Sequence, residues 1–447
     1  MAAGEAVVID ISLKHIQERM DKIPVLGLDD DILDAAVRQI SRIHVFPRGL
    51  RGIGGPDDRY TVPSFVAIGP YHHGQPHLQD MEEVKLAAAR RFVAESKRSL
   101  EDVYVELLSV VGDVRGCYAE EEKVRGFGDA NLATMMLVDG CFLLQFMVGS
   151  KDRMLSSEYG ILKDMMLLEN QIPWLVLETL MKFHDVDVDG FVAEVGDKFF
   201  PREESEGCCS WIQSVCGSWQ CRNSTEALER SVHGSHIYKA RKPTHLLDLL
   251  RLSQIWCMPQ EHIDYKPGHV SLLSSSAVEL AQIGVNLRAS AAAWFGDMSV
   301  RKGRFWGGEL SLSPVFLNDV TACWLVNMAA LEAAGGNAVN GSAVSSYLSV
   351  LAMLMDREED VQQLRGRRVV LSTFSNTQTL EFFKRIGQHL SFHGRYLAVL
   401  EQIEAYRRNR PVMTSIHKFV YNNYKVVGII LSIASVLVGI FKALRGR

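Results

Sequence analysis

The feature that most constrains this chain is an apolar run near its C-terminus, Val426 to Phe441, which contains no charged residue. Lys425 and Lys442 flank the run. As a helix it would span roughly 24 Å, somewhat less than a hydrocarbon core of about 30 Å. The two lysines can extend their aliphatic stems and place their ammonium groups among lipid headgroups, which closes much of the difference. The run therefore predicts a single transmembrane helix over residues 426–444.

A buried core helix is the alternative for an apolar stretch of this length. A core helix usually carries a polar stripe, whereas this run has only Ser432 and Ser435. With Gly428 and Gly439, the serines form small-xxx-small pairs, a spacing that favours close helix packing in lipid. Because few residues follow the run, we expect a tail anchor with the main domain in the cytosol. Basic residues on both sides leave the orientation open.

A basic cluster lies ahead of the apolar run, separated from it by a juxtamembrane segment over residues 412–425. It consists of Arg407, Arg408 and Arg410. Such a cluster would suit anionic lipid headgroups. The alternative is a charged helix end, stabilised by the helix dipole.

The composition of the whole chain limits its class. Of 447 residues, 47% are hydrophobic and 23% charged, which are ordinary globular values and exclude a wholly disordered or multi-span membrane protein. The 48 basic and 53 acidic residues give a net charge of -5. The chain thus lacks the basic signature of nucleic-acid binding, and we expect its partners to be membrane lipid and an unidentified protein.

The cysteines favour a reducing compartment. Eight cysteines in a chain of this length are too few for a disulfide scaffold. A cluster of four does occur, and its spacing departs from that of zinc ligands: Cys208, Cys209, Cys216 and Cys221. Zinc remains the alternative, but we expect structural thiols, no metal and no cofactor.

Helical periodicity dominates the body and predicts a mainly α fold: one large helical domain with a few short strands and a single C-terminal transmembrane helix. We expect an N-terminal extension with a helix over residues 1–41, a domain over 42–411, and an irregular insertion over 184–235. Two helices, 132–147 and 161–181, are apolar nearly all round, which indicates central burial. Pro173 should kink the second or split it.

Other stretches are less regular. A short apolar strand is expected to end at Gly69 and Pro70, and another over Leu310, Leu312 and Phe316, near Pro314. Helices are expected over residues 321–355, interrupted by a Gly-Gly pair, and over 379–406.

The helix predicted over residues 379–406 carries a heptad-like seam. Its apolar positions step by three and four: Phe383, Ile386, Leu390, His393, Leu397 and Leu400. About three heptads are too few to indicate a coiled coil, so a core helix of the same domain is the preferred interpretation. A dimer seam is the alternative, and the oligomeric state stays open.

The sequence contains none of the common nucleophile, phosphate-binding or zinc-protease motifs. A histidine cluster, His72, His73 and His77, precedes Glu82. Such a group would be able to bind a metal or shuttle protons. In the alternative, the imidazoles bind backbone in a packed turn, and Glu82 occupies the first turn of a helix, where negative charge is favoured.

Two carboxylates, Asp139 and Glu169, lie within strongly apolar stretches. A buried carboxylate needs a cationic or hydrogen-bonding partner, or takes up a proton. A pair of this kind is one hypothesis for an acid–base site. The other is a buried polar network that fixes how core helices meet, with Glu169, Asn170 and Gln171 binding backbone groups freed by the kink at Pro173. We predict no catalytic residue and hold His72, His73, Glu82, Asp139 and Glu169 as weak candidates.

Several segments in order resemble the plant family known as domain of unknown function 247, from about residue 42 to the end. They are VFPRGLR (45–51), VAIGPYHHG (66–74) followed by HLQDMEEVK, MMLVDGCFLLQF, LLENQIPWLVLETL, HLLDLLR, AVELAQIGV (277–285), YLSVLAMLMDREEDVQQLR and the apolar tail.

The resemblance implies a helical plant domain with one membrane span, commonly at the plasma membrane, and transfers no catalytic residue. Some grass members are associated with self-incompatibility, which implies protein recognition. We therefore expect a membrane-anchored recognition or signalling protein without catalysis, in a process such as self-incompatibility or defence. The alternative is an enzyme of unknown substrate that uses the histidine and carboxylate cluster.

Overall fold

The computed structural model describes residues 42–53, 58–149, 156–199, 242–255, 275–290, 295–302, 308–335, 342–390, 394–409 and 411–445, and every structural statement below concerns these residues. The predicted N-terminal helix, the cysteine cluster and most of the predicted insertion lie outside them.

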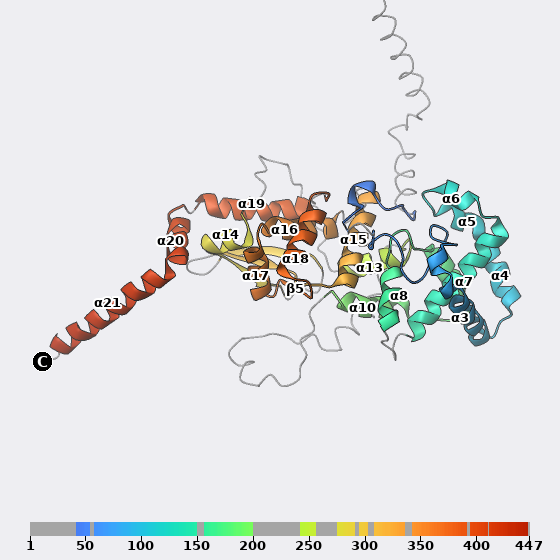
Figure 1. Ribbon diagram of the computed structural model, residues 1–447, viewed down its shortest axis with the longest axis horizontal. Coiled ribbons are helices and arrows are strands. Elements are labelled where there is room, and N and C mark those ends of the chain that lie inside the picture. The colour runs from blue at the N-terminus through green and yellow to red at the C-terminus, as the bar shows by residue number, and fades with distance from the viewer. Residues whose placement is uncertain are drawn as a thin grey trace, which may run out of the picture. The chain divides into compact units, whose positions relative to one another are not determined.

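The described chain is mainly helical, with a few short strands (Figure 1). The α-helices are α3 (Asp80–Ser96), α4 (Leu100–Ser109), α5 (Val111–Gly116), α6 (Glu121–Arg125), α7 (Asp129–Gly149), α8 (Ser156–Asp164), α9 (Trp174–Met181), α10 (Val188–Asp197), α13 (Leu246–Ile255), α14 (Ala277–Gln282), α15 (Asp319–Ala334), α16 (Ala343–Leu354), α17 (Glu358–Gly366), α18 (Asn376–Gly387), α19 (Gly394–Asn409), α20 (Pro411–Asn422) and α21 (Tyr424–Arg445). Two short 3₁₀ helices are η1 (Arg48–Leu50) and η2 (Pro76–Leu78).

The strands form two small sheets. Strands β1 (Val285–Ala289), β2 (Met298–Lys302) and β3 (Gly308–Leu312) have the order β1-β3-β2. Strand β3 pairs in parallel with β1 and antiparallel with β2. Strands β4 (Val315–Leu317) and β5 (Val370–Ser372) pair in parallel. The strand expected around Pro314 is two strands: Leu310 and Leu312 are buried in β3 as expected, but in β4 the buried residues are Val315 and Leu317 rather than Phe316.

Helix α7 lies at the centre of the N-terminal part of the domain, packed against α3, α4 and α9. It is buried on almost all sides, as its uniformly apolar sequence predicts. Gly140 permits the close approach of α9, because a Cβ atom there would overlap the side chain of Leu180.

The proline in the next apolar stretch divides it. Helix α8 ends at Asp164, a turn follows, and α9 begins at Trp174 with Pro173 as its N-cap. Proline suits a helix start, because its missing N–H would have no helical acceptor there. Of the two expected outcomes, kink or split, the structure has the split.

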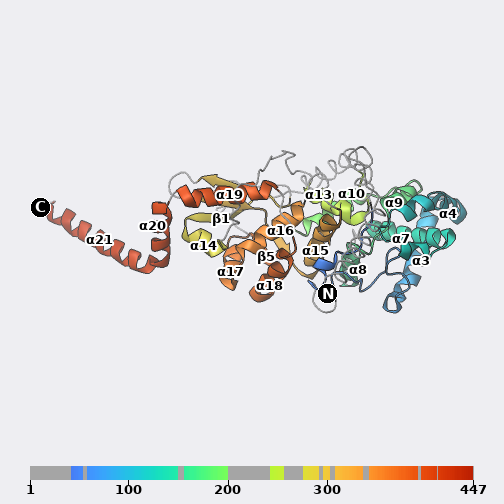
Figure 2. The same ribbon diagram turned by 90° about the horizontal axis from the view of Figure 1, so that it is seen from above.

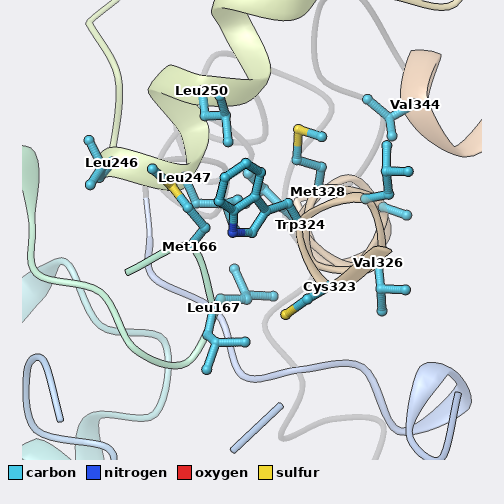
Figure 3. Close-up of a cluster of buried hydrophobic side chains, with 14 of the residues drawn as sticks. Met166, Leu167, Leu246, Leu247, Leu250, Cys323, Trp324, Val326, Met328 and Val344 are labelled. Atoms are coloured by element: carbon cyan, nitrogen blue, oxygen red, sulfur yellow. The ribbon is translucent and has the colours of Figure 1, made fainter. Parts of the chain in front are cut away.

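Another part of the same apolar core surrounds Trp324 on α15 (Figure 3). The indole lies among side chains from α13 and from the turn after α8, including Leu250 and Met166. Helix α15 is buried along most of its length and contacts α8, α13 and α16. It ends at Ala334 and α16 begins at Ala343, as the Gly-Gly pair predicts.

Two predictions of secondary structure were wrong. The segment before Gly69 is irregular rather than a strand; its backbone groups bind side chains, as shown below. The single helix predicted over residues 379–406 is two helices, α18 and α19, because α18 ends at Gly387. Of its predicted seam, Phe383, Ile386 and Leu400 are buried, and His393 lies outside the described residues.

Helices α20 and α21 follow α19 and end the described chain (Figures 1 and 2). Among the described residues, two helices are long and apolar enough to cross a membrane. One is α7, of which 78% of the apolar window is buried inside the protein. The other is the Lys425–Lys442 part of α21, of which 0% is buried.

Candidate functional site

The candidate side chains lie around one irregular segment, residues 63–72. This segment contacts α3, α7, the end of α8 and the turn over residues 165–173 through hydrogen bonds to side chains. We call the side chains that bind it the segment-binding network: Lys85, Asp139, Asp164 and Asn170.

The first part of the network is an ion pair between two helices. Lys85 Nζ on α3 lies 2.6 Å from Asp139 Oδ1 on α7, and both side chains are buried. Lys85 Nζ also lies 2.8 Å from Glu82 Oε1 and donates a 3.0 Å hydrogen bond to Ala67 O. Asp139 Oδ2 accepts a 2.8 Å hydrogen bond from the Gly69 N–H. One buried pair thus binds both helices and the segment.

Electrostatics favours the charged form of this lysine. Burial by itself lowers the pKa of Lys85, but attraction and hydrogen bonds from Asp139 and Glu82 outweigh it, so the pKa is raised. A buried carboxylate with an ammonium group at this distance is a stable arrangement only while both partners are present.

The second part explains why residues 64–66 form no strand. Asp164 Oδ2 accepts hydrogen bonds from the N–H groups of Ser64, Phe65 and Val66, at 2.9, 2.6 and 3.0 Å. These are groups that a neighbouring strand would otherwise bind. Burial raises the pKa of Asp164, and the three backbone donors oppose that rise.

Asn170 completes the binding of the segment, and Gln171 binds the turn over residues 165–173. Asn170 Oδ1 accepts from the Ile68 N–H at 2.8 Å, and its amide donates to Val66 O at 3.0 Å. The Gln171 amide donates to Leu167 O at 2.8 Å, among other carbonyls of the turn. The Gln171 bonds, and a 3.0 Å bond from the Asn170 amide to Asp164 O, agree with the expectation that these side chains bind backbone groups freed at Pro173. The bonds of Asn170 to Ile68 and Val66 were not expected.

Glu169 binds a different part of the N-terminal chain. Its Oε1 accepts from the Phe46 N–H at 2.8 Å and from Arg51 Nη2 at 2.9 Å. Its Oε2 lies 3.7 Å from His72 Nε2, beyond hydrogen-bond range. The pKa of His72 is lowered to about 4, chiefly by burial and further by the positive charges of Lys123, His77 and Arg51. This imidazole is therefore neutral at pH 7.

The structure brings some of the predicted residues together and separates others. Glu82 joins the Lys85–Asp139 pair, and His72 adjoins Glu169. His73 is exposed, and its ring packs edge-on against Phe127 at 5.9 Å. His77 Nε2 lies 3.1 Å from Pro63 O. Within the described ranges, no group of three His, Cys, Asp or Glu residues is placed to hold a metal ion.

Sequence reasoning missed three members of this region. Lys85 shares a helical face with Ala89 and Phe92, which are buried; that spacing was a usable signal. Asn327 lies in the apolar helix α15, accepts from the Leu168 N–H at 2.8 Å and donates to Tyr60 O at 2.8 Å. Asp164 had no comparable signal, because the backbone it binds lies about 100 residues away.

The arginines of the basic cluster before the apolar run differ in their contacts. Arg407 Nη2 lies 3.0 Å from Glu404 Oε2 on α19, and its Nη1 lies 3.4 Å from Ser275 Oγ. Arg408 is exposed, and Arg410 lies outside the described residues. Arg407 thus makes an ion pair within the helix end, and the contacts of this cluster with lipid headgroups stay a prediction.

The comparisons with known proteins agree on one family. Residues 43–438 match the family model DUF247, described as plant protein of unknown function. The chain is similar to the UPF0481 protein At3g47200 of Arabidopsis thaliana, with 27% identity over 74% of this chain and 69% of that protein. It is 37% identical to the UPF0481 protein At3g02645 of the same plant, over 28% of this chain and 24% of that protein. No solved structure matches.

Proposed function

The chain belongs to the DUF247 family of plant proteins of unknown function, and on that premise we propose that it is a membrane-anchored recognition protein. In this proposal α21 spans the plasma membrane, and the helical domain lies in the cytosol and binds a protein partner there without catalysing a reaction.

The exposure of α21 is the observation that supports the anchor. Most of its apolar side chains are more than half exposed, among them Leu431 at 64%, Ile433 at 56% and Val436 at 61%. Leaving a side chain of this type in water rather than in an apolar environment costs about 1.5–3 kcal/mol. Lipid would cover the whole circumference, whereas α7, the other apolar helix of this length, is already covered by protein.

The contacts of the two buried carboxylates support a role other than catalysis. Asp139 and Glu169 each bind a cation and a backbone N–H. A general acid or base must instead reach a proton on a substrate. These carboxylates hold the fold of residues 43–72, which leaves the surface of the domain for recognition.

The cytosolic side is supported by the thiols of the core. Cys141 and Cys323 are buried and unpaired. Burial raises the pKa of the Cys141 thiol to about 12, so it stays protonated and unreactive. Such thiols are typical of a reducing compartment.

Carbonate extraction of plant microsomes tests the anchor. We expect the full chain to stay in the membrane pellet, and the variant Leu431→Arg/Val436→Arg to move to the supernatant, because two charges at the centre of a span strongly disfavour insertion. Leu431→Met/Val436→Ile is the matched control and should stay in the pellet. Release of the unchanged chain would exclude the anchor.

Two further measurements test the rest of the proposal. Protease added to sealed microsomes should digest an N-terminal fluorescent fusion, because the body faces the cytosol; full protection would place it on the other side. Proximity labelling in plant cells should enrich the same proteins with the unchanged chain and with the Met/Ile control, and lose most of them with the double-arginine variant. Equal labelling by all three forms would contradict recognition at the membrane.

A further inference from the structure

Helix α20, directly before α21, is amphipathic and has an uncovered apolar face. We define the apolar face of α20 as Val412, Ile416, Phe419 and Val420, which are 72%, 48%, 62% and 41% exposed. Their spacing of four, three and one residues places them on one side of the helix. Lys418 lies opposite this face, about 150° from its centre, and Asn422 and Ser415 lie between them, at about 110° and 90° from the centre.

A third side of α20 contacts the body. Thr414 and His417 are only partly exposed, and α20 packs against α14. The His417 ring lies against Gly284, where a Cβ atom would come within 2.8 Å of the ring. Gly284 has a φ of +85°, a conformation that glycine adopts without strain. The contact with the body therefore leaves the apolar face open.

The junction with α21 indicates that lipid covers the apolar face of α20. One residue, Asn423, separates the two helices. Its N–H donates to Phe419 O at 3.0 Å, and Val427 N–H donates to Asn423 O at 2.9 Å. Once α21 spans a bilayer, the C-terminal end of α20 must lie at the bilayer surface, because a single residue advances the chain by about 3.8 Å.

We propose that α20 is an interfacial helix that lies along the membrane surface, with its apolar face inserted at the boundary between headgroups and acyl chains. The inference rests on the proposed span of α21. The helix is roughly 18 Å long, has an apolar and a polar side, and carries Tyr421 near the junction, where aromatic side chains favour the membrane interface. Its contact with α14 would hold the body against the bilayer.

Depth measurement on the full chain tests the proposal. The protein is reconstituted into vesicles of phosphatidylcholine and phosphatidylserine at a ratio of about 4:1, with a fluorescent amino acid in place of either Phe419 or Lys418. Lipids that carry a nitroxide near the top of the acyl chain serve as quenchers. We expect quenching at position 419 to be at least about twofold stronger than at 418, because Phe419 lies on the apolar face and Lys418, about 100° further around the helix, lies on the polar side.

Equal quenching at both positions would overturn the proposal. Weak quenching at 419, together with cross-linking between two copies through that position, would also overturn it and assign the face to a second copy of the chain. Cross-linking of position 419 to another protein in native membranes would assign the apolar face to a protein partner and would also overturn the proposal.

A variant pair separates this inference from the anchor itself. Ile416→Asp/Phe419→Asp should speed tryptic cleavage after Lys418 in vesicles by about threefold or more, while Asn422→Asp, on the polar side, should leave the rate unchanged. An unchanged rate in the double variant contradicts the inference. Carbonate resistance should persist in both, since it depends on α21. If the unchanged chain is carbonate-resistant but position 419 is not quenched, the interfacial helix is wrong and the anchor stands.

Discussion

Lys85 Nζ on α3 lies 2.6 Å from Asp139 Oδ1 on α7, and the two side chains are 1% and 2% exposed. The pair joins two helices whose contact is among the most extensive in the domain. Through Ala67 O and Gly69 N–H it also fixes the irregular segment that lies over them. This single contact links helix packing to the course of residues 63–72.

Removal of one partner should therefore destabilise the domain strongly. We expect Lys85→Met to lower the free energy of unfolding by about 3–5 kcal/mol, because it leaves the Asp139 carboxylate buried without its cation. Lys182→Met is the control: Lys182 forms an exposed ion pair with Glu106 at 2.8 Å, and its loss should cost less than about 1 kcal/mol. Urea unfolding of the full chain in mild detergent measures both.

The double variant Lys85→Met/Asp139→Leu gives a further check. It should cost less than Lys85→Met alone, because no charge remains buried, although the Gly69 N–H loses its acceptor at about 1–3 kcal/mol. Equal losses in the control and in Lys85→Met would mean that the pair contributes little.

Gly69 and Gly74 form a matched pair of glycines. Both have positive φ, +75° and +80°. A Cβ atom at Gly69 would lie 2.5 Å from Gln171 O, whereas at Gly74 nothing lies within 4 Å. Gly74→Ala should cost only the backbone strain, about 1–2 kcal/mol, and Gly69→Ala clearly more, because the segment must also move away from the turn. Similar melting temperatures for the two variants would contradict the close packing seen here.

The sequence predicts the helices well where their periodicity is local and unbroken. The uniformly apolar stretch within α7 indicates a buried helix, and Pro173 marks the start of α9. The strand expected before Gly69 was wrong for a physical reason. A short apolar stretch fits a strand, but its backbone partners are side chains such as Asp164, distant in sequence, and local pattern does not reveal them.

The same distinction applies to the candidate site. Asp139 and Glu169 are recognisable because charge in an apolar stretch demands a partner. Their partners, Lys85 and Arg51, depend on how the chain folds back and were not identified in advance. The helix predicted over residues 379–406 was wrong because apolar spacing continues across the break after Gly387.

Asp164 should be the most sensitive acceptor of the segment. In Asp164→Ala the three N–H groups of residues 64–66 lose their acceptor, and we expect a loss of at least about 3 kcal/mol, since each buried donor left unpaired costs about 1–3 kcal/mol. Hydrogen exchange at these amides should accelerate more than at Ile68, which Asn170 binds separately. Uniform acceleration across residues 64–69 would show that the segment opens as one unit.

The stability of the domain should depend on pH through His72. The pKa of this buried imidazole is about 4 in the folded protein against an ordinary value of 6.5. Between these values the unfolded chain binds more protons than the folded one, so protonation favours unfolding. The contribution of His72 is therefore fully present above about pH 6.5 and is lost as the pH falls toward 4, by up to about 3 kcal/mol. Unfolding curves at pH 7.5, 6, 5 and 4 measure it against His72→Met. Other groups titrate equally in both proteins. The free energy of unfolding of the unchanged protein minus that of His72→Met should therefore fall steadily as the pH is lowered. A difference independent of pH would mean that the folded protein accommodates the imidazolium, with Glu169 as its partner.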